Sequence, residues 1–196
     1  MIAAVLFAHK TSIYKGIAGL DVWDRERDAL NYNGNLPVIA HPPCRAWGRL
    51  SHMANPRLGE KDLAHFAVMN VRLYGGVLEH PAYSKLWSAA QLPSPGEIDA
   101  YGGFTLPIYQ SDFGHRAQKV TWLYIVGISP DQLPKPYIVL GEVTHTIGKC
   151  KTKHKPQKKE VNKSEREKTP LLMALWLVKL VQLISEHRQK GAKNAN

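Results

Sequence analysis

The sequence predicts an α/β domain with a mainly parallel sheet, flanking helices and a C-terminal helix that closes the core. Short apolar runs alternate with polar or helical stretches over the first 126 residues, which is typical of strands joined by crossover connections. A strongly apolar stretch near the C-terminus keeps helical spacing. With 44% apolar residues, the 196-residue chain can bury one substantial core and is not a disordered protein.

Five apolar runs are expected as strands, and Phe104–Gln110 is a sixth candidate. The five are Ile2–Ala8, Leu20–Trp23, Pro37–Ala40, Gly76–Leu78 and Val120–Val126. Between the third and fourth runs, apolar residues from Leu63 to Tyr74 follow an acidic first turn and precede Gly75-Gly76, which predicts a helix with a glycine stop. The result is a βαβ unit with a right-handed crossover, and the whole is a reduced Rossmann-like sheet.

Three parts of the chain are distinguished by composition. Residues 1–148 are expected to form the α/β catalytic-like domain, 149–168 a basic flexible segment, and 169–196 a C-terminal helix packed on the domain. Thr169-Pro170 has the form of a helix cap and first helical residue, and apolar positions continue to about His187.

Positive charge is concentrated in the middle part. Residues 1–148 hold thirteen Lys and Arg against twelve Asp and Glu, whereas 149–168 hold nine against three. Such a segment suits a polyanion, because each lysine that neutralises a phosphate releases a counterion; the alternative is a solvated loop that only aids solubility. The residues expected to contact nucleic acid are Lys151, Lys153, Lys155, Lys158 and Lys159.

A cytoplasmic protein without a membrane partner is expected. The N-terminus lacks the features of a secretory signal. The longest apolar run, Leu171–Ile184, contains Lys179 and is shorter than the roughly 20 residues of a membrane span. Cys44 and Cys150 do not form a disulfide framework, so each is a free thiol or a candidate ligand.

Polar residues gather where the predicted strands end. His9 and Lys10 follow the first strand, Asp24 the second, His41-Pro42-Pro43-Cys44 the third, and Glu79-His80-Pro81 the fourth. Ligands of open parallel sheets bind beyond the carboxyl ends of the strands. The four groups therefore predict one shared crevice.

Two of these residues have chemistry of their own. Cys44 follows two prolines and precedes Arg45 and Arg49, whose guanidinium groups could stabilise a nucleophilic thiolate; otherwise it is a small buried apolar residue. Glu79 is a carboxylate at the end of an apolar strand, which requires a task or a structural partner.

Four motifs in order carry a family resemblance: His41-Pro42-Pro43-Cys44, Glu79-His80-Pro81, Phe113-Gly114-His115-Arg116 and Thr121-Trp122-Leu123-Tyr124. From Pro37 to Gly127, about half the chain, the sequence resembles the DNA cytosine-5 methyltransferases. It resembles more closely the short phage-borne proteins described as methylase-like.

The resemblance implies a mechanism and a set of site residues. Cys44 would add to C6 of a pyrimidine, Glu79 would bind the ring N3 and the exocyclic amine, and Arg116 would steady the adduct or a phosphate. S-adenosylmethionine would bind at Asp24, His9 and Lys10. DNA is the expected partner, with RNA or a free nucleotide as alternatives. The further substrate-binding residues implied are His41, Trp47 (which could stack on the base), His80, Gln110, His115 and Gln118.

Departures from the family leave two other functions open. The family's glycine-rich cofactor loop is replaced by Phe7–Ser12, and little chain follows Gly127 for target recognition. A non-catalytic nucleic-acid-binding protein, such as an anti-restriction inhibitor, is therefore one alternative. A metal-dependent hydrolase is the other, since His and Cys residues are available, although no spacing assigns a metal ligand.

Overall fold

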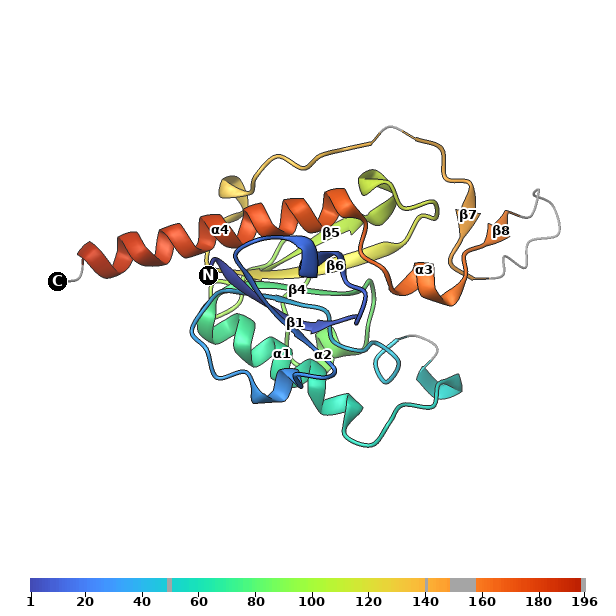
Figure 1. Ribbon diagram of the computed structural model, residues 1–196, viewed down its shortest axis with the longest axis horizontal. Helices are drawn as coiled ribbons and strands as arrows, with labels where there is room; N and C mark the ends of the chain where they lie inside the picture. The colour runs from blue at the N-terminus through green and yellow to red at the C-terminus, as the bar shows by residue number, and fades with distance from the viewer. Residues whose placement is uncertain (49–50, 140, 149–157, 195–196) are drawn as a thin grey trace.

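The computed structural model describes residues 1–48, 51–139, 141–148 and 158–194 (Figure 1). Twelve helices and strands are labelled in chain order. They are β1 (Ala3–Ala8), β2 (Leu20–Asp24), β3 (Val38–Ala40), α1 (Glu60–Tyr74), β4 (Gly76–Pro81), α2 (Leu86–Ala89), β5 (Phe104–Tyr109), β6 (Val120–Val126), β7 (His145–Thr146), β8 (Lys159–Glu160), α3 (Lys163–Glu167) and α4 (Leu171–Asn194).

The central sheet has six strands in the order β2-β1-β3-β4-β6-β5. The neighbours β2, β1, β3 and β4 are parallel, and β6 is antiparallel to both β4 and β5. The prediction of a mixed α/β domain with a mostly parallel sheet is confirmed. β6 has the predicted bounds, whereas β4 continues three residues beyond the predicted Leu78, to Pro81.

The predicted strand, helix and strand unit is β3, α1 and β4, with β3 and β4 paired in parallel. Gly75 ends the helix with a φ of 73°. Gly76 has a φ of 130°, and a Cβ on it would lie 2.0 Å from the carbonyl oxygen of Val38. Only glycine lets β4 begin this close to β3.

Helices cover both faces of the sheet, with α4 on one face and α1 on the other (Figure 1). Buried side chains of α4, including Met173, Trp176, Leu180 and Ile184, pack on one side of the strands. The helix closes the core as predicted and continues past His187. By length and composition, the span Lys163–Gly191 could also cross a membrane, but its apolar side is the one packed on the sheet.

Residues 158–168 differ from the flexible loop expected of them. They form β8, which pairs with β7, and α3. Val161 is buried, and the guanidinium of Arg116 donates hydrogen bonds of 2.8 and 2.5 Å to the carboxylate of Glu165. These long-range contacts hold α3 against the domain. Lys151, Lys153 and Lys155 lie outside the described residues.

Candidate functional site

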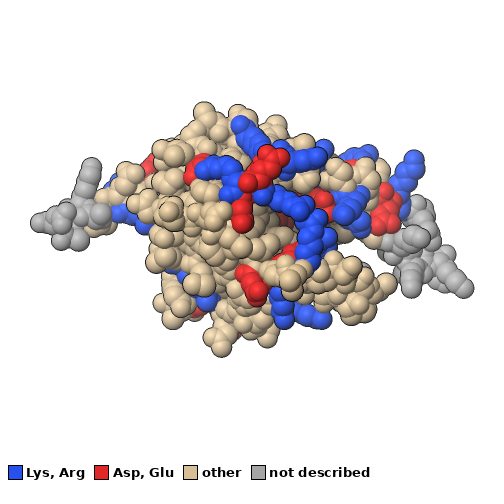
Figure 2. Space-filling view, turned by 60° about the horizontal axis from the view of Figure 1, so that its bottom comes forward, with Lys and Arg blue, Asp and Glu red and all other residues tan. Residues whose placement is uncertain are grey.

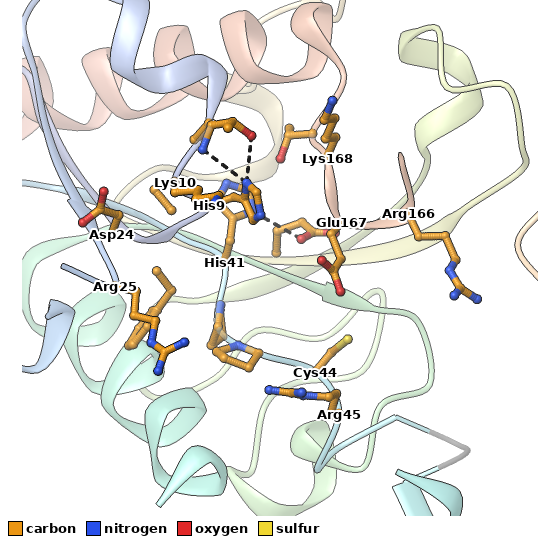
Figure 3. Close-up of a pocket in the computed structure, with 18 of the residues that line it drawn as sticks. His9, Lys10, Asp24, Arg25, His41, Cys44, Arg45, Arg166, Glu167 and Lys168 are labelled. Atoms are coloured by element: carbon orange, nitrogen blue, oxygen red, sulfur yellow. Dashed lines mark hydrogen bonds and ion pairs between the residues drawn. The ribbon is translucent and has the colours of Figure 1, made fainter. Parts of the chain in front are cut away.

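A cleft of about 1000 Å³ opens at the carboxyl ends of the parallel strands. The chain passes from β1 to β2 on one side and continues with β3 on the other, so this edge contains the topological switch point at which α/β sheets bind ligands. Figure 3 shows residues from separate strand ends around it. The predicted site residues that line the cleft are His9, Lys10, Asp24, His41, Cys44 and Glu79.

Glu79 lies at the centre of a polar network. Its Oε2 is 3.3 Å from Nδ1 of His41, and its Oε1 accepts a 2.9 Å hydrogen bond from Nε2 of Gln110 and lies 3.8 Å from Nζ of Lys119. Burial raises the pKa of Glu79, but Lys119 and His41 more than compensate, and its pKa falls to about 2. The carboxylate is therefore ionised at neutral pH.

The sheet topology explains why these partners meet. Gln110 follows the carboxyl end of β5, which is parallel to β4, whereas Lys119 precedes the amino end of the antiparallel β6. All three positions therefore lie at one edge of the sheet. Lys119 was not predicted as a site residue, because the sequence did not reveal the direction of β6.

His41 is held at both of its ring nitrogens. Its Nε2 lies 3.2 Å from the hydroxyl of Tyr14, which comes from the short 3-10 helix after β1. Tyr14 is buried, and burial together with the charge of Glu79 raises its pKa well above the ordinary value. The tyrosine hydroxyl therefore stays protonated, and Tyr14 orients the imidazole. No motif in the sequence pointed to Tyr14.

Cys44 is exposed, but its thiol lines the cleft, where the surrounding protein removes part of its contact with water. This partial burial and the charge of Glu79 raise the pKa of the thiol, whereas Lys119 lowers it. Arg45, whose guanidinium was expected to stabilise the thiolate, is engaged chiefly by another acid. Its guanidinium makes a bidentate ion pair with the buried carboxylate of Glu60. Arg49 lies outside the described residues.

Asp24 is buried, and its carboxylate accepts hydrogen bonds from within the protein. Its Oδ1 accepts hydrogen bonds from the backbone N–H groups of Glu26 and Arg27 at 2.9 and 3.2 Å, and its Oδ2 lies 2.5 Å from Nζ of Lys15. The hydrogen bond from Lys15 is the largest cause that lowers the pKa of Asp24 to about 2. Asp24 therefore also orders the turn after β2.

A second pocket of about 370 Å³ adjoins the cleft and shares Asp24 with it. Its wall also contains the carboxylate of Asp28, which accepts a hydrogen bond from the backbone N–H of Leu30. The apolar lining residues are Phe7, Ala8, Ala29, Leu30, Pro43, Leu58 and Leu63, and the lining also contains Gly59 and the charged residues Arg25, Arg45, Arg57 and Glu60. This pocket suits a flat, mostly apolar group with a polar edge.

Five of the six predicted substrate-binding residues do not line the cleft, and Trp47, His80 and His115 among them are buried. Trp47 is a core residue whose indole N–H donates to the carbonyl of Lys61, so it offers no stacking surface. His80 follows Glu79 in the strand, so its side chain points to the opposite face of the sheet, where it is fully buried. His115 is buried, and its Nδ1 lies 2.8 Å from the carbonyl oxygen of Ala117 in the same loop.

Arg116, Gln110 and Gln118 also lie outside the cleft lining. Gln110 is connected to the cleft by the hydrogen bond that it donates to Glu79. The guanidinium of Arg116, for which the resemblance implied a catalytic role, is paired with Glu165 of α3. Lys158 and Lys159 are exposed beside β7, and neither lines the cleft.

The cleft is nevertheless cationic. Lys and Arg side chains gather on one half of the face shown in Figure 2. The eight cations that line the cleft are Lys10, Arg25, Arg45, Arg57, Lys119, Lys163, Arg166 and Lys168. The four acids are Asp24, Glu26, Glu79 and Glu167. This excess favours an anionic ligand.

No protein-family model matches the chain, and no curated protein or solved structure matches it either. Among the described residues, no group of three or more His, Cys, Asp or Glu side chains is placed to hold a metal ion. The geometry of the cleft is therefore the basis for a functional proposal.

Proposed function

We propose that this protein modifies a pyrimidine base of a nucleic acid or nucleotide through a cysteine nucleophile, as in cytosine-5 methyl transfer. One observation carries the proposal: Cys44 and Glu79, from the ends of two adjacent parallel strands, line one cationic cleft at the switch point of a mostly parallel sheet. The nucleophile, an ionised carboxylate and the cations that attract phosphate are thus available to one ligand.

The chemistry begins with the thiolate of Cys44. Its sulfur forms a bond to C6 of the base, and the electron pair of the C5–C6 double bond moves to C5, which becomes nucleophilic. Glu79, ionised, accepts a hydrogen bond from the exocyclic amine of cytosine. C5 then forms a bond to the electrophilic substituent, and solvent water removes the proton from C5. The electron pair of that C–H bond re-forms the C5–C6 double bond as the sulfur leaves as the thiolate. His41 and Gln110 fix the carboxylate through this sequence.

The residues beside the cleft fit an adenosyl group. Half of the residues that line the smaller pocket are apolar, and Asp24 and Asp28 lie among the charged ones. A carboxylate has about four acceptor positions, of which Asp24 uses three, so one is free for a ribose hydroxyl. When bound, S-adenosylmethionine supplies an electrophilic methyl group. His9 and Lys10 line the part of the cleft nearest the end of β1.

Mass spectrometry of nucleosides tests this function. DNA and RNA from cells that express the protein should contain a modified pyrimidine. The modification should be lost with Cys44→Ser and retained with Cys150→Ser, because the proposal assigns the nucleophile to Cys44, which lines the cleft beside Glu79. A modified pyrimidine that persists in Cys44→Ser cells would exclude Cys44 as the nucleophile.

A second candidate is nucleic-acid binding without chemistry, and the state of Cys44 favours it. The pKa of the thiol is raised, and the nearby Arg45 is held by Glu60. This function predicts that the purified protein binds nucleic acid while the nucleosides of expressing cells remain unmodified.

A further inference from the structure

One wall of the cleft presents two arginines without acidic partners. Arg25 follows β2 and Arg57 precedes α1, and both are exposed at the junction of the cleft and the smaller pocket. Within the part of the chain that the structure describes, neither forms an ion pair, in contrast to Arg45 beside them. Both guanidinium groups are thus available to phosphate oxygens.

The facing wall is built by α3 and the residue that follows it. Lys163 and Lys168 are exposed, line the cleft and have no ion-pair partner among the described residues. The wall is anchored from behind by the Arg116–Glu165 ion pair. In Figure 3, Lys168 and Glu167 lie above Cys44, Arg25 lies to its left and Arg45 lies directly below it.

Between these walls lies the floor with Cys44 and Glu79. Of the four acids that line the cleft, Asp24 is paired with Lys15, and Glu79 with Lys119 and His41, whereas Glu26 and Glu167 form no ion pair among the described residues. These two acids are outnumbered by the five lining cations that likewise form none, which are Lys10, Arg25, Arg57, Lys163 and Lys168. A ligand that fills the cleft therefore contacts Cys44 and Glu79 on the floor and has unpaired cations on both sides. A polynucleotide chain, with a phosphate on each side of every nucleoside, has this charge pattern.

The dimensions favour a single strand over a duplex. About 1000 Å³ is the upper end of the range for small-ligand pockets and exceeds the need of one nucleotide. A base in a duplex must first leave the stack at a cost of a few kcal/mol, which extensive contacts to the duplex must offset. In the described chain after β6, α4 is packed on the sheet and only short elements remain.

We propose that the cleft binds a single-stranded polynucleotide, with its phosphates along Arg25 and Arg57 on one wall and Lys163 and Lys168 on the other. This inference rests on the proposed function for the base at Cys44, and it specifies the substrate of that site. DNA and RNA present the same phosphodiester charge, and the two are separated by experiment.

Fluorescence anisotropy with the Cys44→Ser protein measures binding without chemistry. The probes are a labelled 12-nucleotide single strand of DNA, the same strand in RNA, and the DNA annealed to its complement; unlabelled dCMP is the competitor. Single strands should bind at least tenfold more tightly than the duplex, and dCMP should compete only at far higher concentration. The tighter of the two single strands identifies the sugar. Equal or tighter binding of the duplex overturns the proposal.

Charge-neutralising variants locate the bound strand. Lys163→Gln/Lys168→Gln should weaken single-strand binding roughly tenfold at low salt, and lower the slope of log affinity against log salt by about 1.4. The matched control, Lys179→Gln/Lys190→Gln, removes two exposed cations of α4 that do not line the cleft and should change neither value. Equal effects of the two pairs would mean that binding follows net charge alone, and would overturn the placement.

A second variant tests the wall without changing its lysines. Arg116→Ala removes the anchor of α3, so it should weaken binding of the single strand more than that of dCMP, with circular dichroism confirming the fold. Failure here is separable from failure of the proposed function. If modified nucleosides are found but single strands are not preferred, the single-strand proposal is wrong and the proposed chemistry stands. If binding depends on the wall lysines but no modified nucleoside is found, the proposed chemistry is wrong and the single-strand proposal stands.

Discussion

Nδ1 of His41 lies 3.3 Å from Oε2 of Glu79, 38 residues along the chain. The parallel register that pairs Ala40 with Leu78 makes His41 and Glu79 neighbours at the point where β3 and β4 leave the ladder. Pro42 and Pro43 then restrict the chain that leads to Cys44. Strand register and proline stiffness thus bring the thiol and the carboxylate into one cleft.

The reactivity of Cys44 should depend on two neighbouring charges. In a Cys150→Ser background, the pH midpoint of the alkylation rate with iodoacetamide should lie above that of an unstructured cysteine, because partial burial and Glu79 raise the pKa of the thiol. Glu79→Gln should lower the midpoint, and Lys119→Gln should raise it. A midpoint below the ordinary cysteine value would show that the free protein already favours the thiolate.

His80 should make the protein less stable in weak acid. Burial lowers its pKa from 6.5 to about 4. Below pH 6.5 the unfolded chain binds a proton that the folded protein accepts only near pH 4, so stability falls as pH drops through this window. The contribution is of the order of 3 kcal/mol.

His80→Phe should remove this loss, and also two ring nitrogens that have no hydrogen-bond partner among the described residues. Urea unfolding of both proteins at pH 7 and pH 4.5 measures the difference. Wild type should lose about 2–3 kcal/mol more than the variant over this interval. Parallel losses would mean that His80 is solvated or bonded in solution.

Arg45 should matter for folding stability. Arg45→Met leaves the carboxylate of Glu60, which is only 4% exposed, without its guanidinium partner. A loss of about 1–3 kcal/mol is expected, because an uncompensated buried charge remains. Adding Glu60→Gln should restore part of it. Arg166→Ala, which breaks the more exposed pair with Glu160, should cost less than about 1 kcal/mol in the same denaturation assay.

S-adenosylmethionine should stabilise the protein if the smaller pocket holds its adenosyl group. At a hundredfold excess over Kd the gain is about 2.7 kcal/mol, visible as a thermal shift. Asp24→Asn keeps an oxygen for the backbone N–H groups of the turn but loses the ribose acceptor, so the shift should shrink. Asp21→Asn, outside both pockets, is the control. No calorimetric binding at millimolar cofactor, with or without nucleic acid, would rule out methyl transfer and leave the binding function.

Local patterns predicted the elements well. The apolar runs located every strand of the central sheet to within a few residues, and Gly75-Gly76 marked the end of α1. The alternation of side chains along a strand could also have separated His80 from Glu79, since adjacent residues face opposite sides of a sheet. This alternation predicts that His80 and Glu79 cannot both face the same ligand.

The ion-pair partners of the arginines could not be predicted from local patterns. Arg45 and Arg116 follow Cys44 and His115 in the sequence, which suggested a role in catalysis, but their guanidinium groups are paired with Glu60 and Glu165. Those carboxylates are 15 and 49 residues away. A charge in the sequence carries no information about which opposite charge the folded chain will place beside it.

The sequence by itself determined the strands of the central sheet, α1, α4 and the polar residues at the strand ends, because apolar periodicity and glycine or proline positions are local properties of the chain. Tertiary structure alone decided the antiparallel direction of β6, which brings Lys119 to Glu79, and the docking of α3 across the cleft. Both depend on contacts between distant segments, whose free energies arise only when the whole core packs.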